Sequence, residues 1–426
     1  MNKKPLVFAI SNRKGGVLKT SSCVNLGYAY SQIGKKVLLI DADPQGSLTQ
    51  LLGIDRNIGN SPELSISNLS KVSKELRLQE NQPYKVDDLF GRPSKGELEQ
   101  YDITGLHSLI IKSFYNEPIS KADIANAIIT PTYKIEIPKK ELSAEVKEGK
   151  ISPEQLGKVM YRNYKFGFDL IPSSEELTDD ELVISLDNDK NRQYTKGIAM
   201  YKIIRQISKY CDYDIVLIDT GPSLGILTIN AIAAATDGVV ISASVDEQSL
   251  WSLQKFKFNI RQVKQLIPGH EGILGVILGP VDVRSQIYPI ISYKITRVLN
   301  LYMFNSKISR SANAAKATAS GLLLSQLDEK AYNAYIKLAN EILERYEQNH
   351  TWETERNEMV KKESEKIKAE NPLLSDDEVF EMIVDKYSRG ELWQMPMNDR
   401  YHIKICGMDI FNLFHLSRQF IFTVCI

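Results

Sequence analysis

The residue types best suited to chemistry gather in a short glycine-containing loop near the N-terminus. The loop reads Lys-Gly-Gly-Val-Leu-Lys-Thr at residues 14–20, after an apolar run at 6–10 and before an expected helix at 19–33. Glycine lets backbone N–H groups approach a phosphate closely, and a helix N-terminus adds a positive field. In such a loop a lysine reaches the β- and γ-phosphates and a hydroxyl binds Mg²⁺, the roles expected of Lys19 and Thr20. The predicted nucleotide-binding residues are Gly15, Gly16, Val17, Leu18, Lys19, Thr20 and Ser21.

Two positions of this loop depart from the general pattern G-x-x-x-x-G-K-[ST]. Arg13 stands where the first glycine belongs, and Leu18 replaces the last one. A leucine Cβ could crowd the β-phosphate, or the side chain could point away from it. Because Lys19 and Thr20 are retained, we expect strain of about 1–3 kcal/mol to weaken nucleotide binding rather than abolish it. The alternative reading is a glycine turn with incidental lysines.

Acidic residues follow two other predicted strands. Asp41 and Asp43 stand in Asp-Ala-Asp-Pro-Gln-Gly, which begins at the end of the run at 36–42, and Asp219 ends a later apolar run. In parallel α/β sheets, ligands bind at the carboxyl ends of strands. We predict that Asp43 positions or deprotonates an attacking water, and that Thr20, Asp41 and Asp219 serve Mg²⁺. The alternatives are a loop with acidic helix caps and a buried strand that ends in a capping aspartate.

The elements that must position these residues alternate along the chain. Further short apolar runs, typical of buried strands, occur at 168–171, 215–219, 238–243 and 272–278. Expected helices separate most of them, at 196–210, 224–235, 249–266 and 332–346. This alternation predicts an α/β fold with a doubly wound, mostly parallel sheet covered on both faces. With the glycine loop, it predicts a P-loop NTPase.

Two stretches interrupt the alternation. Residues from about 54 to 165 are polar and mixed, and we interpret them as a helical insertion with mobile loops. From 347 to 426 the chain is expected to form a charged, helical C-terminal extension, with a further helix start at Ser375. The main domain is therefore predicted to span 1–346.

The composition indicates where in the cell the protein works more clearly than what it binds. Lys+Arg and Asp+Glu both count 53, so net charge indicates no binding partner. The four cysteines form no CxxC pair, and one His402–Cys406 spacing is a weak metal signal. No segment reaches the roughly 18 apolar residues of a membrane span, and the run at 5–10 is too short for a signal peptide. We expect a cytoplasmic protein.

The three chemical strings together resemble the ParA/MinD family, and within it the ParA/Soj-type partition ATPases. Residues 14–20 resemble its deviant Walker A loop, KGGxGK[ST], except at Leu18. The Asp-x-Asp-Pro-Gln-Gly string matches a switch of the family, and residues 219–225 match DTPPSLG except at Gly221. The resemblance covers about 5–53 and 166–345. It implies ATP and Mg²⁺ as cofactors, a catalytic role for Asp43, and a Lys14 that reaches the partner's nucleotide in a dimer. No cysteine follows either switch, which disfavours the nitrogenase iron-protein branch.

A long basic stretch is the candidate DNA surface. Residues between Asp282 and Asp328 include no acid. They carry the basic residues Arg284, Lys294, Arg297, Lys307, Arg310 and Lys316. We predict non-specific phosphate contacts from Arg284, Lys307, Arg310 and Lys316, and Ile308-Ser309-Arg310 resembles the family's I-P-R string. Because Arg310 lies far along the chain from the nucleotide motifs, we expect its replacement to spare nucleotide binding. The alternative is a solvated basic face.

These predictions converge on an ATP-dependent DNA-partition ATPase that is cytoplasmic and nucleoid-associated. ATP would join two subunits into a homodimer that binds non-specific double-stranded DNA, and a ParB-like centromere-binding partner would stimulate hydrolysis and release. One alternative is a MinD-like membrane-associated positioning ATPase, suggested by the apolar residues 411–426. That segment has few basic residues, so no membrane partner is expected. The other alternative is a DNA-binding module whose nucleotide site has decayed at Leu18.

Overall fold

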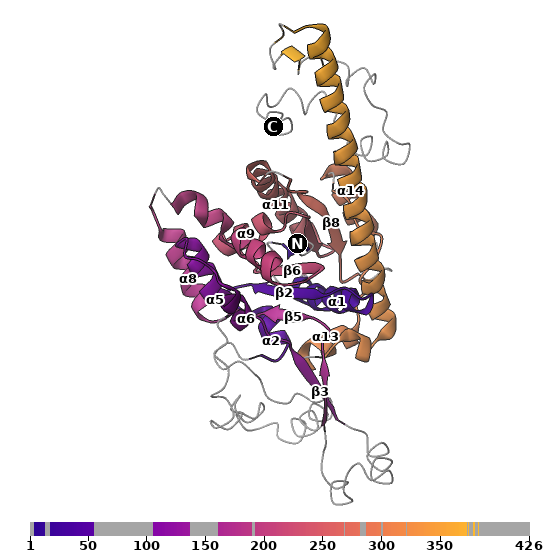
Figure 1. The fold of residues 1–426 in the computed structure, drawn as a ribbon. Helices are drawn as coiled ribbons and strands as arrows, with labels where there is room; N and C mark the ends of the chain where they lie inside the picture. Colours follow the sequence, from indigo (N-terminus) through magenta and orange to yellow (C-terminus); the bar gives the residue numbers. More distant parts are fainter. Residues whose placement is uncertain are drawn as a thin grey trace, which may run out of the picture.

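A six-stranded sheet forms the centre of the computed structural model (Figure 1). The structure describes residues 4–12, 18–54, 105–136, 161–189, 192–267, 269–281, 287–299, 301–320 and 322–372, and single residues beyond them up to 382. The strands are β1 (Leu6–Ser11), β2 (Val37–Ala42), β5 (Asp169–Ile171), β6 (Ile215–Thr220), β7 (Val239–Ala243) and β8 (Ile273–Leu278). They pair in the order β5-β2-β6-β1-β7-β8, and every pair is parallel.

Both faces of the sheet are buried, which is why these strands are almost continuously apolar. Alternate residues of β1 show the two faces, since Val7 belongs to one hydrophobic cluster and Phe8 to the other. Helices α1 (Lys19–Gln32) and α14 (Glu329–Glu370) cover the Phe8 face. The Val7 face is covered by α5 (Gly105–Phe114), α9 (Gln193–Tyr210), α10 (Ile226–Ala234) and α11 (Glu247–Leu266). The predicted doubly wound α/β fold is confirmed.

Shorter elements complete the described chain. They are α2 (Ser47–Leu51), α6 (Lys121–Ala127), α8 (Glu176–Leu186), α12 (Ile287–Tyr293), which continues as a π-helix over Lys294–Val298, α13 (Ala312–Ser320) and a 3-10 turn at Leu324–Gln326. None of the helices that the structure describes is long and apolar enough to cross a bilayer.

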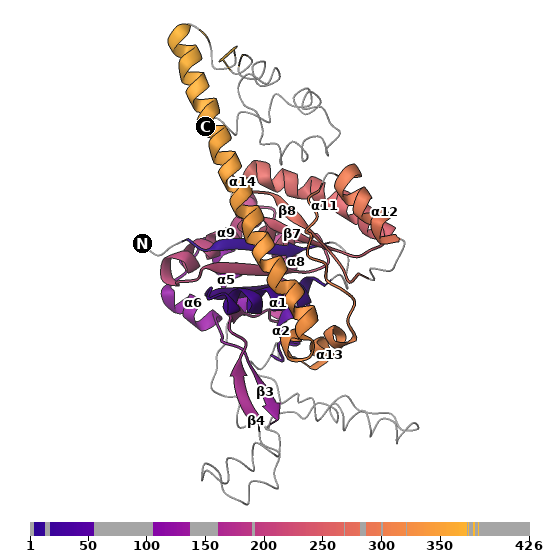
Figure 2. The ribbon, with the colours of Figure 1, turned by 90° about the vertical axis from the view of Figure 1, so that its right-hand side faces the viewer.

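The predicted insertion contains more than helices. Its described part includes α5, whose Leu106, Leu109 and Phe114 are fully buried in the core of the Val7 face. It also contains an antiparallel pair, β3 (Thr132–Glu136) and β4 (Tyr161–Lys165), which the sequence did not predict. This pair projects away from the main sheet (Figures 1 and 2).

The last long helix passes the predicted domain boundary at 346 without a break. Its 42 residues span about 63 Å at 1.5 Å per residue. Tyr335, Leu338 and Ile342 of its first half are buried against α1 and the sheet. The second half extends beyond the sheet (Figure 2). The charged extension is thus helical to Glu370, while the helix start expected at Ser375 lies outside the described residues.

Candidate functional site

The carboxyl ends of β1, β2 and β6 bring the three predicted strings together. β6 lies between β1 and β2, and its Asp219 pairs in register with Ile10 on one side and with Asp41 on the other. The glycine loop follows β1 in the chain, and Ile10 of β1 is the register partner of Asp219. Lys14, Gly15, Gly16 and Val17 lie outside the described residues, and the described part of the loop resumes at Leu18.

Leu18 takes the backbone conformation that the general pattern reserves for glycine. Its φ of 60° and ψ of 9° are left-handed, a region that costs an ordinary residue about 1–2 kcal/mol. Its carbonyl nevertheless accepts the Ser22 N–H at 2.8 Å, so α1 begins normally. Residue 18 therefore has a backbone conformation typical of glycine although it carries a leucine side chain.

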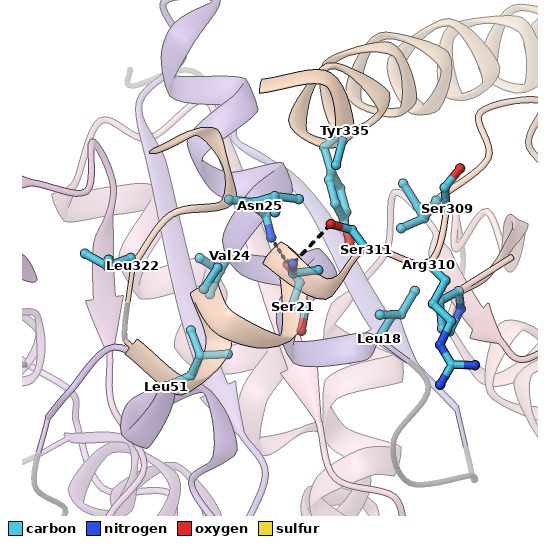
Figure 3. A pocket seen from close by; sticks show the side chains of 16 residues that line it. Leu18, Ser21, Val24, Asn25, Leu51, Ser309, Arg310, Ser311, Leu322 and Tyr335 are labelled. Atoms are coloured by element: carbon cyan, nitrogen blue, oxygen red, sulfur yellow. Dashed lines mark hydrogen bonds between the residues drawn. The ribbon is translucent and has the colours of Figure 1, made fainter. Parts of the chain in front are cut away.

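The Leu18 side chain packs into a pocket lined by α1, α13 and α14 (Figure 3). A Cβ added to Gly279 would lie 3.0 Å from Leu18 Cδ1 and 2.9 Å from the Ile308 carbonyl oxygen. Gly279 thus supplies the space that the leucine fills. Of the two orientations left open by the sequence, the structure has the one in which Leu18 joins the apolar cluster of the Phe8 face.

Asp219 is the most unusual group at this edge. It is fully buried, and neither carboxylate oxygen has a hydrogen bond of normal geometry among the described residues, although the Thr20 hydroxyl lies close enough to act on the carboxylate. Burial raises the pKa of Asp219, the Asp41 carboxylate raises it further, and the nearby Thr20 hydroxyl and Lys19 ammonium oppose that shift. Burial also lowers the pKa of Lys19, against the attraction of Asp219 and Asp43. A buried carboxylate without donors is expected where a cation binds.

Asp41 organises the neighbouring loop. Its Oδ2 accepts the Thr49 hydroxyl at 2.6 Å and the Thr49 N–H at 2.8 Å, and its Oδ1 accepts the Asp43 N–H at 3.2 Å. Burial raises the pKa of Asp41 to about 6, although these hydrogen bonds act in the opposite direction. The carboxylate therefore holds α2 and the loop before it, and its predicted service to Mg²⁺ stays a prediction.

Asp43 is held between two segments. Its Oδ1 accepts the Gln45 N–H at 3.0 Å, and its Oδ2 accepts the Ser47 hydroxyl at 2.8 Å. A Cβ added to Gly221 would lie 2.9 Å from Asp43 Oδ1. The glycine that departs from the DTPPSLG pattern thus lets the predicted catalytic carboxylate rest against the segment after β6.

The residues present fit a magnesium ion that is shared with phosphates. The described residues contain no group of three or more His, Cys, Asp or Glu side chains that could hold a metal by themselves. Mg²⁺ commonly keeps several waters and takes one or two carboxylates together with phosphate oxygens. The unpartnered Asp219 carboxylate beside Thr20 provides such a partial ligand set.

The pocket beside Leu18 has a volume of about 230 Å³ and combines apolar and polar walls. Its lining residues are Leu18, Ser21, Val24, Asn25, Leu51, Pro280, Ile308, Ser309, Arg310, Ser311, Ala314, Ala317, Leu322, Leu324, Ala331 and Tyr335. Sequence reasoning missed most of them, because they come from elements that are far apart in the chain. The signals that led to this region were the glycine-loop motif for Leu18 and Ser21, and the basic stretch with its I-P-R resemblance for Arg310.

The predicted DNA residues are only partly a free basic row. Lys307, Arg310 and Lys316 are exposed, and Arg284 lies outside the described residues. The Lys307 ammonium lies 4.8 Å from the centre of the Tyr288 ring. Arg310 lines the pocket together with Leu18 and Ser21 (Figure 3). The expectation that Arg310 lies far from the nucleotide motifs, which rested on its distance along the chain, is therefore wrong.

The chain matches the family model described as "CobQ/CobB/MinD/ParA nucleotide binding domain" over residues 8–384. It therefore belongs to this family of nucleotide-binding domains, and the predicted resemblance to ParA and MinD is confirmed. Among named relatives, the chromosome partitioning protein ParA of Caulobacter vibrioides is 26% identical over 81% of this chain and 97% of that protein. The sporulation initiation inhibitor protein Soj of Bacillus subtilis is 24% identical over 79% of this chain and 97% of that protein.

Solved structures show the same fold at lower identity. The ATP complex of a Cyanothece McdA variant has a TM-score of 0.53 and 20% identity over 80% of this chain and 97% of that one. The Mycobacterium smegmatis cobyrinic acid a,c-diamide synthase with bound ATP analog and magnesium has a TM-score of 0.51 and 19% identity over 80% of this chain and 96% of that one. Both share a P-loop-type α/β architecture with this chain.

Proposed function

We propose that this chain is an ATPase of the partition type, which binds ATP with Mg²⁺ and uses hydrolysis to control DNA binding. The observation that carries the proposal is the buried, unpartnered carboxylate of Asp219 beside Lys19 and Thr20 at the end of the glycine loop. The names of the ParA and Soj relatives support a role in partition.

Each residue has a definite role in this proposal. Gly15 to Ser21 surround the phosphates, and Lys19 neutralises the β- and γ-phosphates. Thr20, Asp41 and Asp219 would hold Mg²⁺, and the bound ion would screen the phosphate charge. Asp43 positions the attacking water or takes its proton. Lys14 reaches the nucleotide of the second subunit and so makes dimerisation depend on ATP.

The pocket beside Leu18 suits the nucleotide base. It opens next to Ser21 of α1 and has apolar walls from Leu18, Pro280 and Ile308. Because Leu18 packs toward Gly279 and Ile308, it forms part of this wall, which argues against a nucleotide site that has decayed at this position.

DNA binding is assigned to Arg284, Lys307, Arg310 and Lys316. The dimer is the DNA-binding state, and a ParB-like partner stimulates hydrolysis and so returns the chain to monomers that leave the DNA. On this proposal the protein works in the cytoplasm on the nucleoid.

The test is a calorimetric titration of the full chain with ATP in the presence and absence of Mg²⁺. We expect binding that Mg²⁺ strengthens, and we expect Asp219→Asn to lose most of that strengthening while it still binds nucleotide. An absence of ATP and ADP binding at millimolar nucleotide would refute the proposal. If Leu18→Gly then restored binding, Leu18 alone would be the cause.

A further inference from the structure

Two neighbouring helices at one edge of the molecule expose large apolar side chains. On α11, Trp251 is 70% exposed and Phe258 is 61% exposed, and apolar side chains that gather on one surface mark an interaction site more often than single ones do. On α12, Ile287, Ile290 and Tyr293 are each more than half exposed. None of these five residues lines the pocket beside Leu18.

The two exposed sets belong to one surface. Lys294, directly after Tyr293, donates to the Glu247 carboxylate at 2.7 Å, and Trp251 follows Glu247 by one helical turn on α11. Figure 2 shows α11 and α12 beside each other. Leu253, Phe256 and Ile260, on the opposite side of α11, are buried in the core. The side of α11 that carries Trp251 and Phe258 therefore faces solvent. We call these three aromatic side chains and one aliphatic side chain the aromatic surface: Trp251, Phe258, Tyr293 and Ile290.

The charge around the aromatic surface is positive. Lys255 and Arg261 are exposed on the same side of α11 as Trp251 and Phe258. The only acidic residue in the α11 sequence, Glu247, is neutralised by Lys294. A complementary partner must therefore offer apolar side chains together with acidic ones.

DNA fits this surface less well than a protein does. The α11 sequence also contains Lys257 and Lys264, but their ammonium groups donate to the backbone carbonyls of Leu299 and Glu271. Two exposed cations remain beside two large apolar rings. A duplex presents phosphates and would leave those rings unburied, whereas an amphipathic helix buries them.

We propose that the aromatic surface docks an acidic amphipathic helix of a partner protein. Trp251 and Phe258 are seven residues apart, about 10 Å along α11 at 1.5 Å per residue, which matches apolar residues repeated every two turns on the docking helix. Acidic residues that flank this apolar stripe meet Lys255 and Arg261. The proposal goes beyond the proposed ATPase function and does not depend on hydrolysis.

The first arm of the test identifies what covers the surface. A photo-crosslinking benzophenone amino acid is placed at position 258 of the full chain in the cells that express it, and at position 186 as a control. Leu186 of α8 is 66% exposed and lies on a different helix. We expect an adduct at 258, absent at 186, with a segment of another protein that is acidic and has apolar residues three, four or seven apart.

The second arm measures whether that contact is specific. A synthetic peptide of the crosslinked segment is titrated against the purified full chain. We expect Trp251→Ala to weaken its affinity at least tenfold and Lys255→Glu about threefold, more at low salt, while Leu186→Ala changes it less than twofold. Thermal unfolding of each variant checks that it is folded.

Several results would overturn the proposal. They are adducts at 258 with nucleic acid, with a second copy or another part of this chain, or with no molecule at all. A crosslinked peptide that binds Trp251→Ala as tightly as the unchanged chain would overturn it as well.

Discussion

Gly221→Ala offers a clean perturbation of the predicted catalytic carboxylate. The φ of Gly221 lies outside the left-handed region, so alanine brings no backbone strain, but its Cβ would lie 2.9 Å from Asp43 Oδ1. Asp43 must then move and lose its hydrogen bond from the Gln45 N–H or from the Ser47 hydroxyl. A hydrogen bond to a charged group contributes about 1.5–3 kcal/mol. At about 1.4 kcal/mol per factor of ten, we expect ATP turnover to fall ten- to a hundredfold.

Nucleotide affinity should change little, because the new Cβ meets Asp43 and Pro44, and Asp43 is assigned to the attacking water rather than to the phosphates. The assay is steady-state ATP turnover together with calorimetric ATP binding. Gly197→Ala on α9 is the matched control, since a Cβ there meets no atom within 4 Å, and it should stabilise the fold by about 0.5–1 kcal/mol without affecting turnover. Turnover that is unchanged or faster in Gly221→Ala would show that the observed Asp43 position is not the one that hydrolyses ATP.

Five further variants test the other assignments. Asp43→Ala should give a persistent ATP dimer by light scattering with slow hydrolysis, and wild-type turnover would remove Asp43 from catalysis. Lys14→Ala should keep ADP binding but lose ATP-dependent dimerisation, and a normal dimer would make Lys14 a surface charge. Arg310→Glu should weaken DNA binding about tenfold or more at physiological salt, with a salt dependence shallower by about one unit of slope. Lys316 does not line the pocket, so Lys316→Glu should weaken DNA binding without altering ATP binding, whereas Arg310→Glu should alter both. Unchanged DNA affinity in both variants would show that the DNA surface lies elsewhere. Asp41 has its pKa raised to about 6 from 3.8, so its neutral form favours the folded state. The contribution of Asp41 to the free energy of unfolding is therefore complete below about pH 4 and is lost as the pH rises through 6. The loss is about 3 kcal/mol, at about 1.4 kcal/mol for each unit of pKa difference. The unfolding free energy of Asp41→Asn should lack this loss, and a pH-independent difference between the two proteins would contradict the assignment.

The strands and helices around the site were predictable because their burial is nearly complete. β2 and β6 are buried along their whole length, so their apolar runs stand out in sequence and place Asp41 and Asp219 at strand ends. The parallel register then aligns Asp41 with Asp219. These features follow from local pattern and from the general rules of parallel sheets.

Other features depend on contacts between distant residues. The orientation of Leu18 is decided by the space at Gly279, and the position of Asp43 by the space at Gly221. Arg310 reaches the pocket because the segment after β8 folds back over α1, which spacing along the chain does not reveal. The β3–β4 pair is short and is stabilised by aromatic contacts, such as Tyr133 with Tyr164, whose ring centres lie 5.5 Å apart. Because the surrounding sequence is polar, no apolar run indicated these strands.

In the proposed function, a nucleotide switch and a DNA surface are coupled in one chain. The most direct measurement is the rate of ATP hydrolysis by the full chain with and without non-specific double-stranded DNA, repeated with Asp43→Ala. We expect the rate of hydrolysis to change when DNA is added and hydrolysis to be lost in Asp43→Ala. Hydrolysis that is absent under both conditions, or present but indifferent to DNA and to Asp43, would contradict the proposed function.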